Sequence, residues 1–517
     1  MQVQLQVQQE SPRSWQPLSA GWWTGQVFTD GHWLDTEEID QVLQTVQSAT
    51  DLVSLLKHWN GHFALLWSKG DLHLAATDIA RSIPLFWRVE PEQVTLSDHP
   101  ILDPGVANVW QASKALANAE FIPGHATLWY GWQQIQAGEI LEVKGSLCYL
   151  HNYFPHRRPP SPQRTSQQWA ESFHQVLENS IDRLISFAGE RTIIIPLSGG
   201  YDSRVLLAAL HHKGFANLKA FTYGLPDSTE VRIAREITEQ LQIEWSFVPY
   251  AADLIGQFGD NEWFNYAEFA SKGSALPQEQ DYFSLLALKK KGWLKGGEII
   301  CPGYCGDFQA GSYLPNALIP WPPSRVRRLQ EQLLSRFVRE LDPTTRQNWL
   351  PLLPKEEIQD EEQYISELEH WVLREYVSKY IVNGVRAYEW FGCHWHLPLW
   401  DLEFIQFWQQ VPNELRQGME LYRQVLRENW FKPHNIAFPE DETATGNTIS
   451  PANWLPPQWK KRLKNYLPAK ETTDVNGLQQ LIPLIQNQLA WPEIDLTKSV
   501  NEMIGHWYHE FINNKRV

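Results

Sequence analysis

The stretch from residue 192 to residue 206 constrains the fold most, because a strand, a glycine-rich turn and a helix start follow one another directly. Residues 192–197 are apolar and mostly β-branched, which predicts a buried strand. The turn holds Ser198, Gly199 and Gly200, and glycine lets the backbone approach a ligand closely. Because the unpaired N–H groups at a helix start attract negative charge, this order of elements predicts an anion-binding site.

Two further residues give the turn a more specific chemistry. Ser198 and Ser203 offer hydroxyl donors, and Asp202 offers a hard oxygen ligand of the kind that Mg²⁺ prefers. The alternative is an ordinary strand–turn–helix connection in which Asp202 caps the helix. The pattern is not a P-loop, because the Gly-Lys-Ser/Thr that a P-loop requires does not follow the turn.

The turn resembles the pyrophosphate loop of the N-type ATP pyrophosphatases. These enzymes cleave ATP between the α and β phosphates and attach AMP to a substrate oxygen. The resemblance implies that ATP and Mg²⁺ are cofactors, with Asp202 as a ligand of the metal. The loop residues that it implies for nucleotide binding are Leu197, Ser198, Gly199, Gly200, Asp202 and Ser203.

Strand and helix patterns alternate after this loop. Residues 218–223 and 244–249 read as strands, and residues 231–241 read as a helix with Ser228 as its N-cap. Short connections between alternating elements predict a doubly wound parallel sheet with the ligand at the carboxyl ends of its strands. The resemblance places Tyr223 and Gly224 in the adenine pocket. The alternative for this strand is plain sheet core.

A second strand runs into a glycine-spaced turn at residues 298–313. This segment resembles one in asparagine synthetases, where Gly303 and Asp307 fall in register. The resemblance makes Asp307 the second Mg²⁺ carboxylate, opposite Asp202. The alternative is that Asp307 caps the following turn. The family's next acidic residue is replaced here by Phe308.

The family's glutamate between the two glycines of this segment is replaced by Tyr304. In β-lactam synthetases, which belong to the same family, a tyrosine at this position helps to deprotonate the attacking amine. Tyr304 is therefore a candidate general base, with Glu389 or, second, Glu375 as the partner that relays its proton. A purely structural tyrosine is the alternative.

The stretch from residue 320 to residue 517 shows mainly helical periodicity. Residues 398–401 resemble the family's Pro-Phe-Leu-Asp, and residues 421–427 resemble its Lys-x-x-Leu-Arg helix. The lysine that holds the phosphates in the family is not evident in residues 437–443. Lys432 lies near this segment, and Arg204, directly after the pyrophosphate loop, is the candidate for supplying the missing charge.

Residues 1–155 read mostly as strands and resemble the glutaminase half of glutamine-dependent asparagine synthetases. That resemblance implies an Ntn-hydrolase-like αββα domain, followed by a proline-rich linker at 156–165 and a synthetase domain at 166–517. The family's nucleophile is a cysteine directly after the initiator methionine, and Gln2 stands there in this sequence. We therefore expect that the domain does not hydrolyse glutamine.

Composition narrows the classes of partner. The 517 residues include 44 basic and 60 acidic ones, a net charge of −16, which argues against nucleic acid as a partner. The four cysteines are too few for a disulfide framework. The N-terminus lacks a signal-peptide pattern and no long uncharged apolar run occurs, so we expect a cytoplasmic protein without membrane association. A homodimer is the oligomeric state that we consider as a further expectation.

These observations predict a Mg²⁺- and ATP-dependent, AMP-forming amide ligase with an α/β fold. Its partners would be a carboxylic acid and ammonia or an amine, in the biosynthesis of a polysaccharide or a specialised metabolite. Two alternatives stay open: an asparagine synthetase that uses aspartate, and a catalytically silent ATP-binding partner or scaffold protein.

Overall fold

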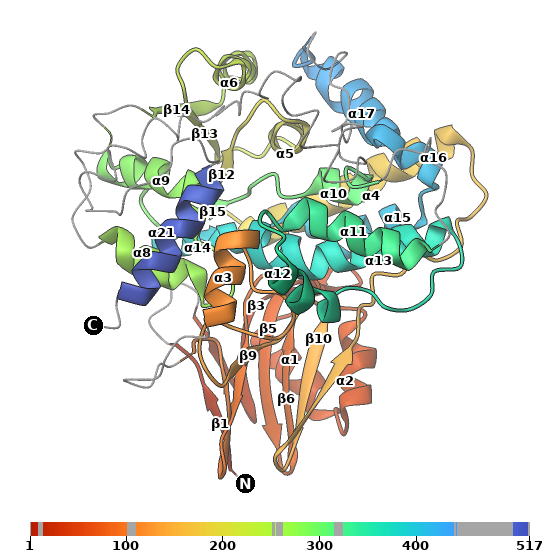
Figure 1. Cartoon of the computed structure of the whole chain (residues 1–517). Helices are drawn as coiled ribbons and strands as arrows, with labels where there is room; N and C mark the ends of the chain where they lie inside the picture. The colour runs from red at the N-terminus through yellow and green to blue at the C-terminus, as the bar shows by residue number, and fades with distance from the viewer. Residues whose placement is uncertain are drawn as a thin grey trace.

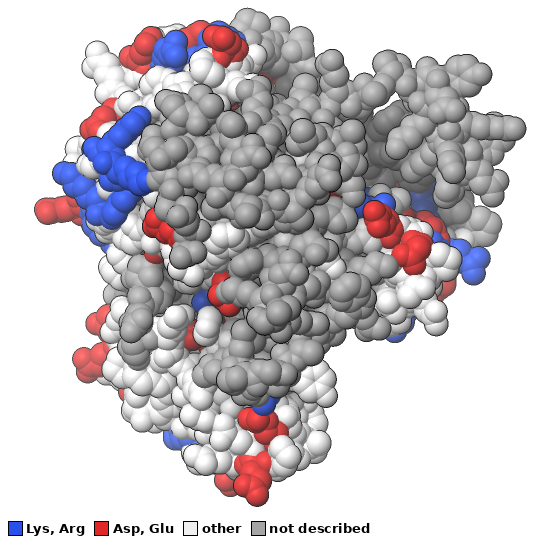
Figure 2. Space-filling view, turned by 60° about the vertical axis from the view of Figure 1, so that its left-hand side comes forward, with Lys and Arg blue, Asp and Glu red and all other residues white. Residues whose placement is uncertain are grey.

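The computed structural model describes residues 2–8, 14–100, 110–250, 254, 262–314, 324–438, 441 and 500–514. Figure 1 shows a strand-rich N-terminal part below and a mixed α/β part above it. The described residues contain no helix that is both long and apolar enough to cross a bilayer. On the face seen in Figure 2, the described Lys and Arg side chains gather mainly in one group, with Asp and Glu in several separate places.

The N-terminal part holds two sheets. The larger one has the order β11-β10-β6-β5-β3-β2, with β4 paired to β3, and the smaller one has the order β1-β8-β7-β9. The larger sheet comprises β2 (Gln16–Leu18), β3 (Gly21–Thr29), β4 (His32–Trp33), β5 (Asn60–Lys69), β6 (Leu72–Thr77), β10 (Glu139–Lys144) and β11 (Leu147–Asn152). The smaller comprises β1 (Gln2–Gln6), β7 (Phe86–Val89), β8 (Gln93–Ser97) and β9 (Trp132–Gln134), and the helices of this part are α1 (Thr36–Gln44), α2 (Ala49–Leu56) and α3 (Trp110–Ala119). The Ntn-hydrolase-like assignment stays a prediction.

The upper part is built on a five-stranded sheet of order β14-β13-β12-β15-β16, in which every pairing is parallel. Its strands are β12 (Ile193–Pro196), β13 (Leu218–Gly224), β14 (Glu244–Pro249), β15 (Ile299–Ile300) and β16 (His394–Trp395), and α4 (Ser166–Ala188), α5 (Tyr201–His212) and α6 (Thr229–Leu241) accompany them. The predicted mixed α/β fold with a parallel sheet is confirmed. Ser228 caps α6 as predicted, since its side chain accepts a hydrogen bond from the Val231 N–H.

The described residues form further α-helices after β14. They are α8 (Glu262–Ser271), α9 (Gln280–Lys290), α10 (Gly306–Ala310), α11 (Arg325–Phe337), α12 (Pro343–Trp349), α13 (Glu361–Val372), α14 (Arg386–Trp390), α15 (Leu402–Gln410), α16 (Asn413–Arg416), α17 (Glu420–Leu426) and α21 (Val500–Asn514). A π-helical stretch, η2 (Leu373–Ile381), and a 3₁₀ turn, η3 (Val382–Val385), join α13 to α14. In Figure 1 the C-terminal α21 lies beside α3 of the N-terminal part.

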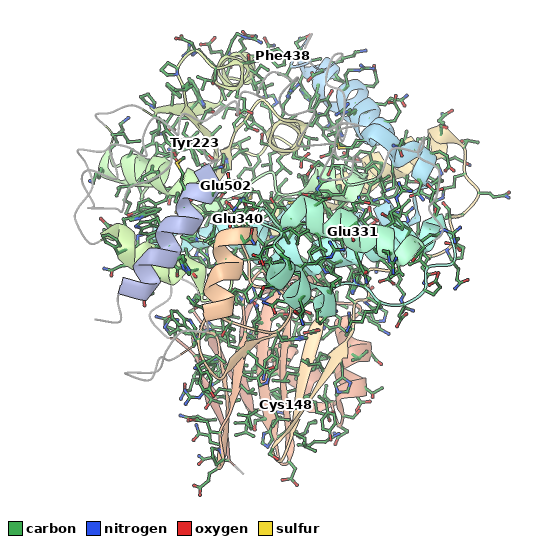
Figure 3. All side chains as sticks on the ribbon, in the orientation of Figure 1. Cys148, Tyr223, Glu331, Glu340, Phe438 and Glu502 are labelled. Atoms are coloured by element: carbon green, nitrogen blue, oxygen red, sulfur yellow. The ribbon has the colours of Figure 1, made fainter. Side chains whose placement is uncertain are left out.

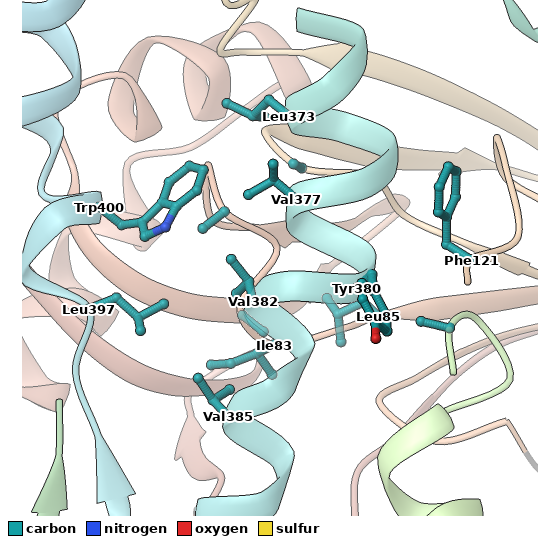
Figure 4. Packing of buried hydrophobic residues seen from close by; sticks show 14 of the residues in the cluster. Ile83, Leu85, Phe121, Leu373, Val377, Tyr380, Val382, Val385, Leu397 and Trp400 are labelled. Carbon is teal, nitrogen blue, oxygen red and sulfur yellow. The ribbon is translucent and has the colours of Figure 1, made fainter. Parts of the chain in front are cut away.

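The two parts share one hydrophobic core. Ile83 and Leu85 come from the N-terminal part, and they lie among Val382 and Val385 of η3 and Leu397 beyond β16 (Figure 4). All five side chains are less than 5% exposed. Because burial of apolar surface drives this packing, the N-terminal part is a structural support for the helices of the upper part.

Charged groups are also buried at this junction. The Lys379 ammonium is fully buried and pairs with Glu375, and it donates to the carbonyls of Ile122 at 3.0 Å and Gly124 at 2.7 Å. Burial lowers the pKa of Lys379 to about 8 even though Glu375 favours the charged form. A buried ion pair with all its hydrogen bonds made is stable as a unit, but the loss of one partner leaves an uncompensated charge.

We therefore expect Lys379→Met to destabilise the protein by about 3–5 kcal/mol, because Glu375 and two carbonyls lose their partner inside the core. Equilibrium unfolding in urea measures this loss. Lys432→Met is the matched control, because Lys432 makes an exposed pair with Glu428 on the surface. An equal effect of the two substitutions would contradict the interpretation of the junction.

Candidate active site

The loop between β12 and α5 is held by its own serines. The Ser203 hydroxyl accepts from the Ser198 N–H at 3.1 Å, and the two hydroxyls lie 3.0 Å apart. Gly200 is the N-cap of α5 and makes no side-chain cap hydrogen bond. The structure thus contradicts the alternative in which Asp202 caps this helix, and the start of α5 faces a cavity, as an anion-binding loop requires.

Two carboxylates approach each other beside this loop. The Asp307 N–H donates to Oδ2 of Asp202 at 3.2 Å, and the Tyr422 hydroxyl donates to Oδ1 of Asp202 at 2.7 Å. Burial, and then the negative charge of Asp307, raise the pKa of Asp202 to about 7. Burial also raises the pKa of Asp307. A divalent cation between the two carboxylates would remove this repulsion, so the pair fits Mg²⁺.

The approach of the two loops depends on Gly303. A Cβ atom at this position would lie 2.6 Å from the Ser203 backbone nitrogen and 3.0 Å from Cβ of Asp202. Backbone atoms cannot give way as a flexible side chain does, so a larger residue would push the loop after β15 away from α5. Cys305 precedes α10 as its N-cap, so Asp307 is not the cap of that helix.

A cavity of about 410 Å³ opens between these loops, a size within the usual range for small-molecule sites. Eight of the residues predicted to belong to the site line it: Ser198, Gly200, Asp202, Ser203, Tyr223, Gly303, Tyr304 and Asp307. The predicted residues Leu197, Gly199 and Gly224 do not appear in its lining. Leu197 is buried in the sheet core, and Gly199 packs against Glu230 and Ile233 of α6.

The structure corrects the role expected of Arg204. Its side chain is only 1% exposed and pairs with Asp441 at 2.7 Å, and it also donates to the Gly199 carbonyl at 2.6 Å. The Arg204 charge therefore lies behind the loop, where it supports the loop backbone and is already compensated. Arg423 of α17 is the basic residue in the cavity lining instead.

The expected partners of Tyr304 are also corrected. Glu389 pairs with Arg386 at 2.7 Å and accepts a hydrogen bond from the Trp395 indole at 2.8 Å. Glu375 pairs with Lys379 at the junction between the two parts. The Tyr304 hydroxyl lies instead 3.5 Å from Oδ2 of Asp281 and 3.4 Å from the Tyr388 hydroxyl. The carboxylate that faces Tyr304 is therefore Asp281, at the start of α9.

Asp281 lies at the centre of a cluster of tyrosines. The Tyr388 hydroxyl donates to Asp281 at 2.5 Å, and Tyr223 also donates a hydrogen bond to it. Burial raises the pKa of Asp281, and burial together with the Asp281 charge raises the pKa of Tyr304 well above its usual value. At neutral pH the Tyr304 hydroxyl is thus a hydrogen-bond donor. It can move a proton only in exchange with a neighbour such as Asp281.

Sequence reasoning missed Asp281, Tyr388, Tyr422 and Arg423 as cavity residues. The helix at residues 421–427 had been matched to a family motif, but a motif does not tell which of its side chains face the loop. Asp281 and Tyr388 lie on helices more than 100 residues apart along the chain, so no local pattern could connect them.

Residues 172–430 match the family model of asparagine synthase. This match covers half of the sequence and includes both carboxylates and every residue that lines the cavity. The chain belongs to the asparagine synthase family.

One protein of similar sequence is the carboxyethyl-arginine beta-lactam-synthase of Streptomyces clavuligerus. It is 27% identical to this chain over 266 residues, which cover 49% of the chain and 46% of the relative. The chain thus matches about half the length of that protein. Among solved structures, the glutamine phosphoribosylpyrophosphate amidotransferase from B. subtilis complexed with ADP and GMP aligns over 56% of each chain at 11% identity. Its TM-score of 0.18 is too low to support any argument about the fold.

The two neighbouring carboxylates should make the stability of the folded protein depend on pH. Because the folded-state pKa of Asp202 is raised to about 7, the folded protein binds a proton there that an unfolded aspartate releases near pH 4. The wild-type protein without metal should therefore gain stability as the pH falls from 8 to 5. Asp202→Asn removes this charge and should stabilise the metal-free protein at pH 8 by roughly 1–3 kcal/mol.

Urea unfolding of both proteins between pH 5 and pH 8, with a metal chelator present, measures the difference. The advantage of the variant should shrink toward pH 5, where the wild-type Asp202 is protonated. A constant difference across this range would show that the repulsion between the two carboxylates is not its cause.

Proposed function

We propose that this chain is an ATP- and Mg²⁺-dependent ligase. It activates a substrate carboxylate by adenylation, releases pyrophosphate, and joins the acyl group to ammonia or an amine. The observation that carries the proposal is the approach of Asp202 and Asp307 beside a helix-start anion loop, in a chain of the asparagine synthase family. This arrangement suits a metal-bound polyphosphate, because two carboxylates and several N–H and hydroxyl donors converge on one cavity.

In this proposal the loop binds the leaving pyrophosphate. Ser198, Ser203 and the N–H groups at the start of α5 donate hydrogen bonds to its oxygens. Asp202 and Asp307 hold Mg²⁺, which neutralises the charge that develops on the leaving group. Tyr422 keeps Asp202 oriented through the hydrogen bond to Oδ1.

Arg423 supplies the cationic side chain that the phosphates need. It lines the same cavity as Asp202 and lies next to Tyr422 on α17. A guanidinium offers several N–H donors in a fixed plane that matches phosphate oxygens. Arg423 therefore takes the role for which the sequence had suggested Arg204.

Tyr304 lines the cavity together with Asp281 and Tyr388, which are next to its hydroxyl. We place it at the acyl-transfer step, where a proton must leave the attacking nitrogen. Its hydroxyl passes this proton toward Asp281, because a separate phenolate is disfavoured at this buried position.

The nitrogen source is ammonia or an amine rather than glutamine cleaved by a thiol of the N-terminal part. Among the described residues of that part, the thiol is Cys148 of β11, and burial raises its pKa. A thiol with a raised pKa is a poor nucleophile. Cys148 also lies far from Tyr223 of the cavity, as the labelled side chains in Figure 3 show.

The first test is pyrophosphate release from ATP·Mg²⁺ with a panel of carboxylic acids, in the presence of ammonia and then of glutamine. Pyrophosphate release with an acid and ammonia supports the ligase. Release that occurs with aspartate and with no other acid of the panel identifies an asparagine synthetase. ATP binding without pyrophosphate release with any acid would favour the silent partner protein.

Asp307→Asn should lower kcat by about 100-fold or more, because it removes a metal ligand. The matched control Glu244→Gln changes an exposed carboxylate on β14 and should leave the rate unchanged.

Arg423→Gln gives an independent prediction. If Arg423 contacts the phosphates, the substitution should lower kcat/KM for ATP by roughly 10- to 100-fold, because one charge-assisted contact is lost. Arg427→Gln is the matched control, since Arg427 lies one helical turn further along and pairs with Glu428. Equal and small effects of both substitutions would remove Arg423 from the phosphate site.

A further inference from the structure

A buried ion pair lies behind the loop that connects β12 to α5. Arg204 stands in the first turn of α5 and is only 1% exposed. Its Nη2 donates to the Gly199 carbonyl at 2.6 Å, and its Nη1 donates to Asp441 at 2.7 Å. The guanidinium therefore lies between the loop and the carboxylate. A positive charge at a helix start opposes the helix dipole, so the stability of α5 alone does not explain this placement.

The hydrogen bond from Arg204 fixes the direction of the next N–H group in the loop. The peptide bond between Gly199 and Gly200 is trans, so its C=O and N–H point in opposite directions. The C=O accepts from Arg204, and the Gly200 N–H donates to the Ser198 hydroxyl at 3.2 Å. Ser198 and Gly200 both line the cavity. Arg204 thus turns this N–H group toward the place where an anion would accept from it.

Aromatic rings enclose the guanidinium. Its Cζ atom lies 4.5 Å from the ring centroid of Phe431, 5.2 Å from that of Phe438 and 5.4 Å from that of Tyr201. Such rings attract a cation, and their burial keeps mobile ions away, so the two charges of the pair are poorly screened. The loss of either charge should therefore change the electrostatic potential at the loop.

Asp441 is held by the chain that follows α17. Its carboxylate accepts from the Phe438 N–H at 2.9 Å, and its carbonyl accepts from the Tyr201 hydroxyl at 3.3 Å. Arg204 also donates to the Ile436 carbonyl at 3.3 Å. The pair thus joins the loop to the chain that leaves α17, a helix that also lines the cavity. As a unit the pair is neutral, with its positive end toward the loop.

We propose that Arg204 and Asp441 are positioning residues that set how tightly the loop binds pyrophosphate. The inference rests on the proposed ligase function and adds a control of product release to it. Arg204 directs the Gly200 N–H at the anion, and its charge attracts the phosphate oxygens from behind the loop. Asp441 limits this attraction, so that pyrophosphate leaves once the acyl-adenylate has formed.

Calorimetric binding of pyrophosphate with Mg²⁺ at pH 7 tests the pair without turnover. Asp441→Asn keeps an acceptor for the Phe438 N–H but leaves the Arg204 charge uncompensated, so this variant should bind pyrophosphate about tenfold more tightly. The double variant Arg204→Met with Asp441→Asn is neutral and no longer holds the Gly199 carbonyl. It should bind pyrophosphate about tenfold more weakly than the wild type. Shifts in opposite directions distinguish this role from a loss of folding, which would weaken binding in both variants.

Two controls separate charge from stability. Asp441→Glu keeps the charge, so its affinity for pyrophosphate should stay within about twofold of the wild type. Asp401→Asn breaks another buried ion pair, with Arg183, outside the cavity lining. This variant should unfold at a lower urea concentration and bind pyrophosphate as the wild type does. If the double variant does not fold, Asp441→Asn against Asp441→Glu still decides, because only the loss of charge should tighten binding.

Turnover separates this inference from the ligase itself. Opposite shifts in pyrophosphate affinity, without AMP formation from any acid, would support the pair and overturn only the ligase. Shifts in the same direction, an unchanged affinity in Asp441→Asn, or no binding of pyrophosphate by the wild type would overturn the role of the pair. Pyrophosphate release with an acid and ammonia would leave the ligase standing in that case. Where turnover is measurable, added pyrophosphate should inhibit Asp441→Asn more strongly than the wild type.

Discussion

The site depends on the close approach of two like-charged groups, Asp202 and Asp307. The strands β12 and β15 are parallel neighbours, so their carboxyl ends meet at one edge of the sheet and bring both carboxylates there. Gly303 allows the contact, because no side chain separates the second loop from α5. The Asp307 N–H and the Tyr422 hydroxyl compensate part of the repulsion. In the proposed function, a bound cation would offset the remaining repulsion.

The N-terminal part contributes to this site from a distance. Arg386 donates to the Ser82 carbonyl at 2.7 Å, and the η3 residues pack on Ile83 and Leu85. These contacts fix the helix that carries Tyr388 and the backbone at Gly384 beside Tyr304. Because a packed core transmits position rigidly, this part can be kept for its support of the site, whatever chemistry it performs itself.

Several features of the site were readable from local sequence. The loop at residues 198–203 and the carboxylate Asp307 each follow a buried strand, and short-range patterns report such strand–turn–helix units well. The roles that we expected of Arg204 at the phosphates and of Glu389 beside Tyr304 were wrong, and the reason is physical. Arg204 was assigned by its nearness in sequence, yet its buried side chain pairs with Asp441 and does not line the cavity. Glu389 follows Tyr388 directly, but consecutive helical residues point in different directions, so it pairs with Arg386 while Tyr388 reaches Asp281.

The sequence by itself determined the alternating strand and helix units, the loop at residues 198–203 and the two acidic residues after strands, because each depends on residues that are neighbours along the chain. Only the tertiary structure decided which groups share the cavity. Asp281, Tyr304 and Tyr388 meet across more than 100 residues, and Arg423 replaces Arg204 at the cavity wall. Strand order and helix packing decide which side chains come together in this way. Turning a helix about its axis by one residue changes the side chain that faces the cavity.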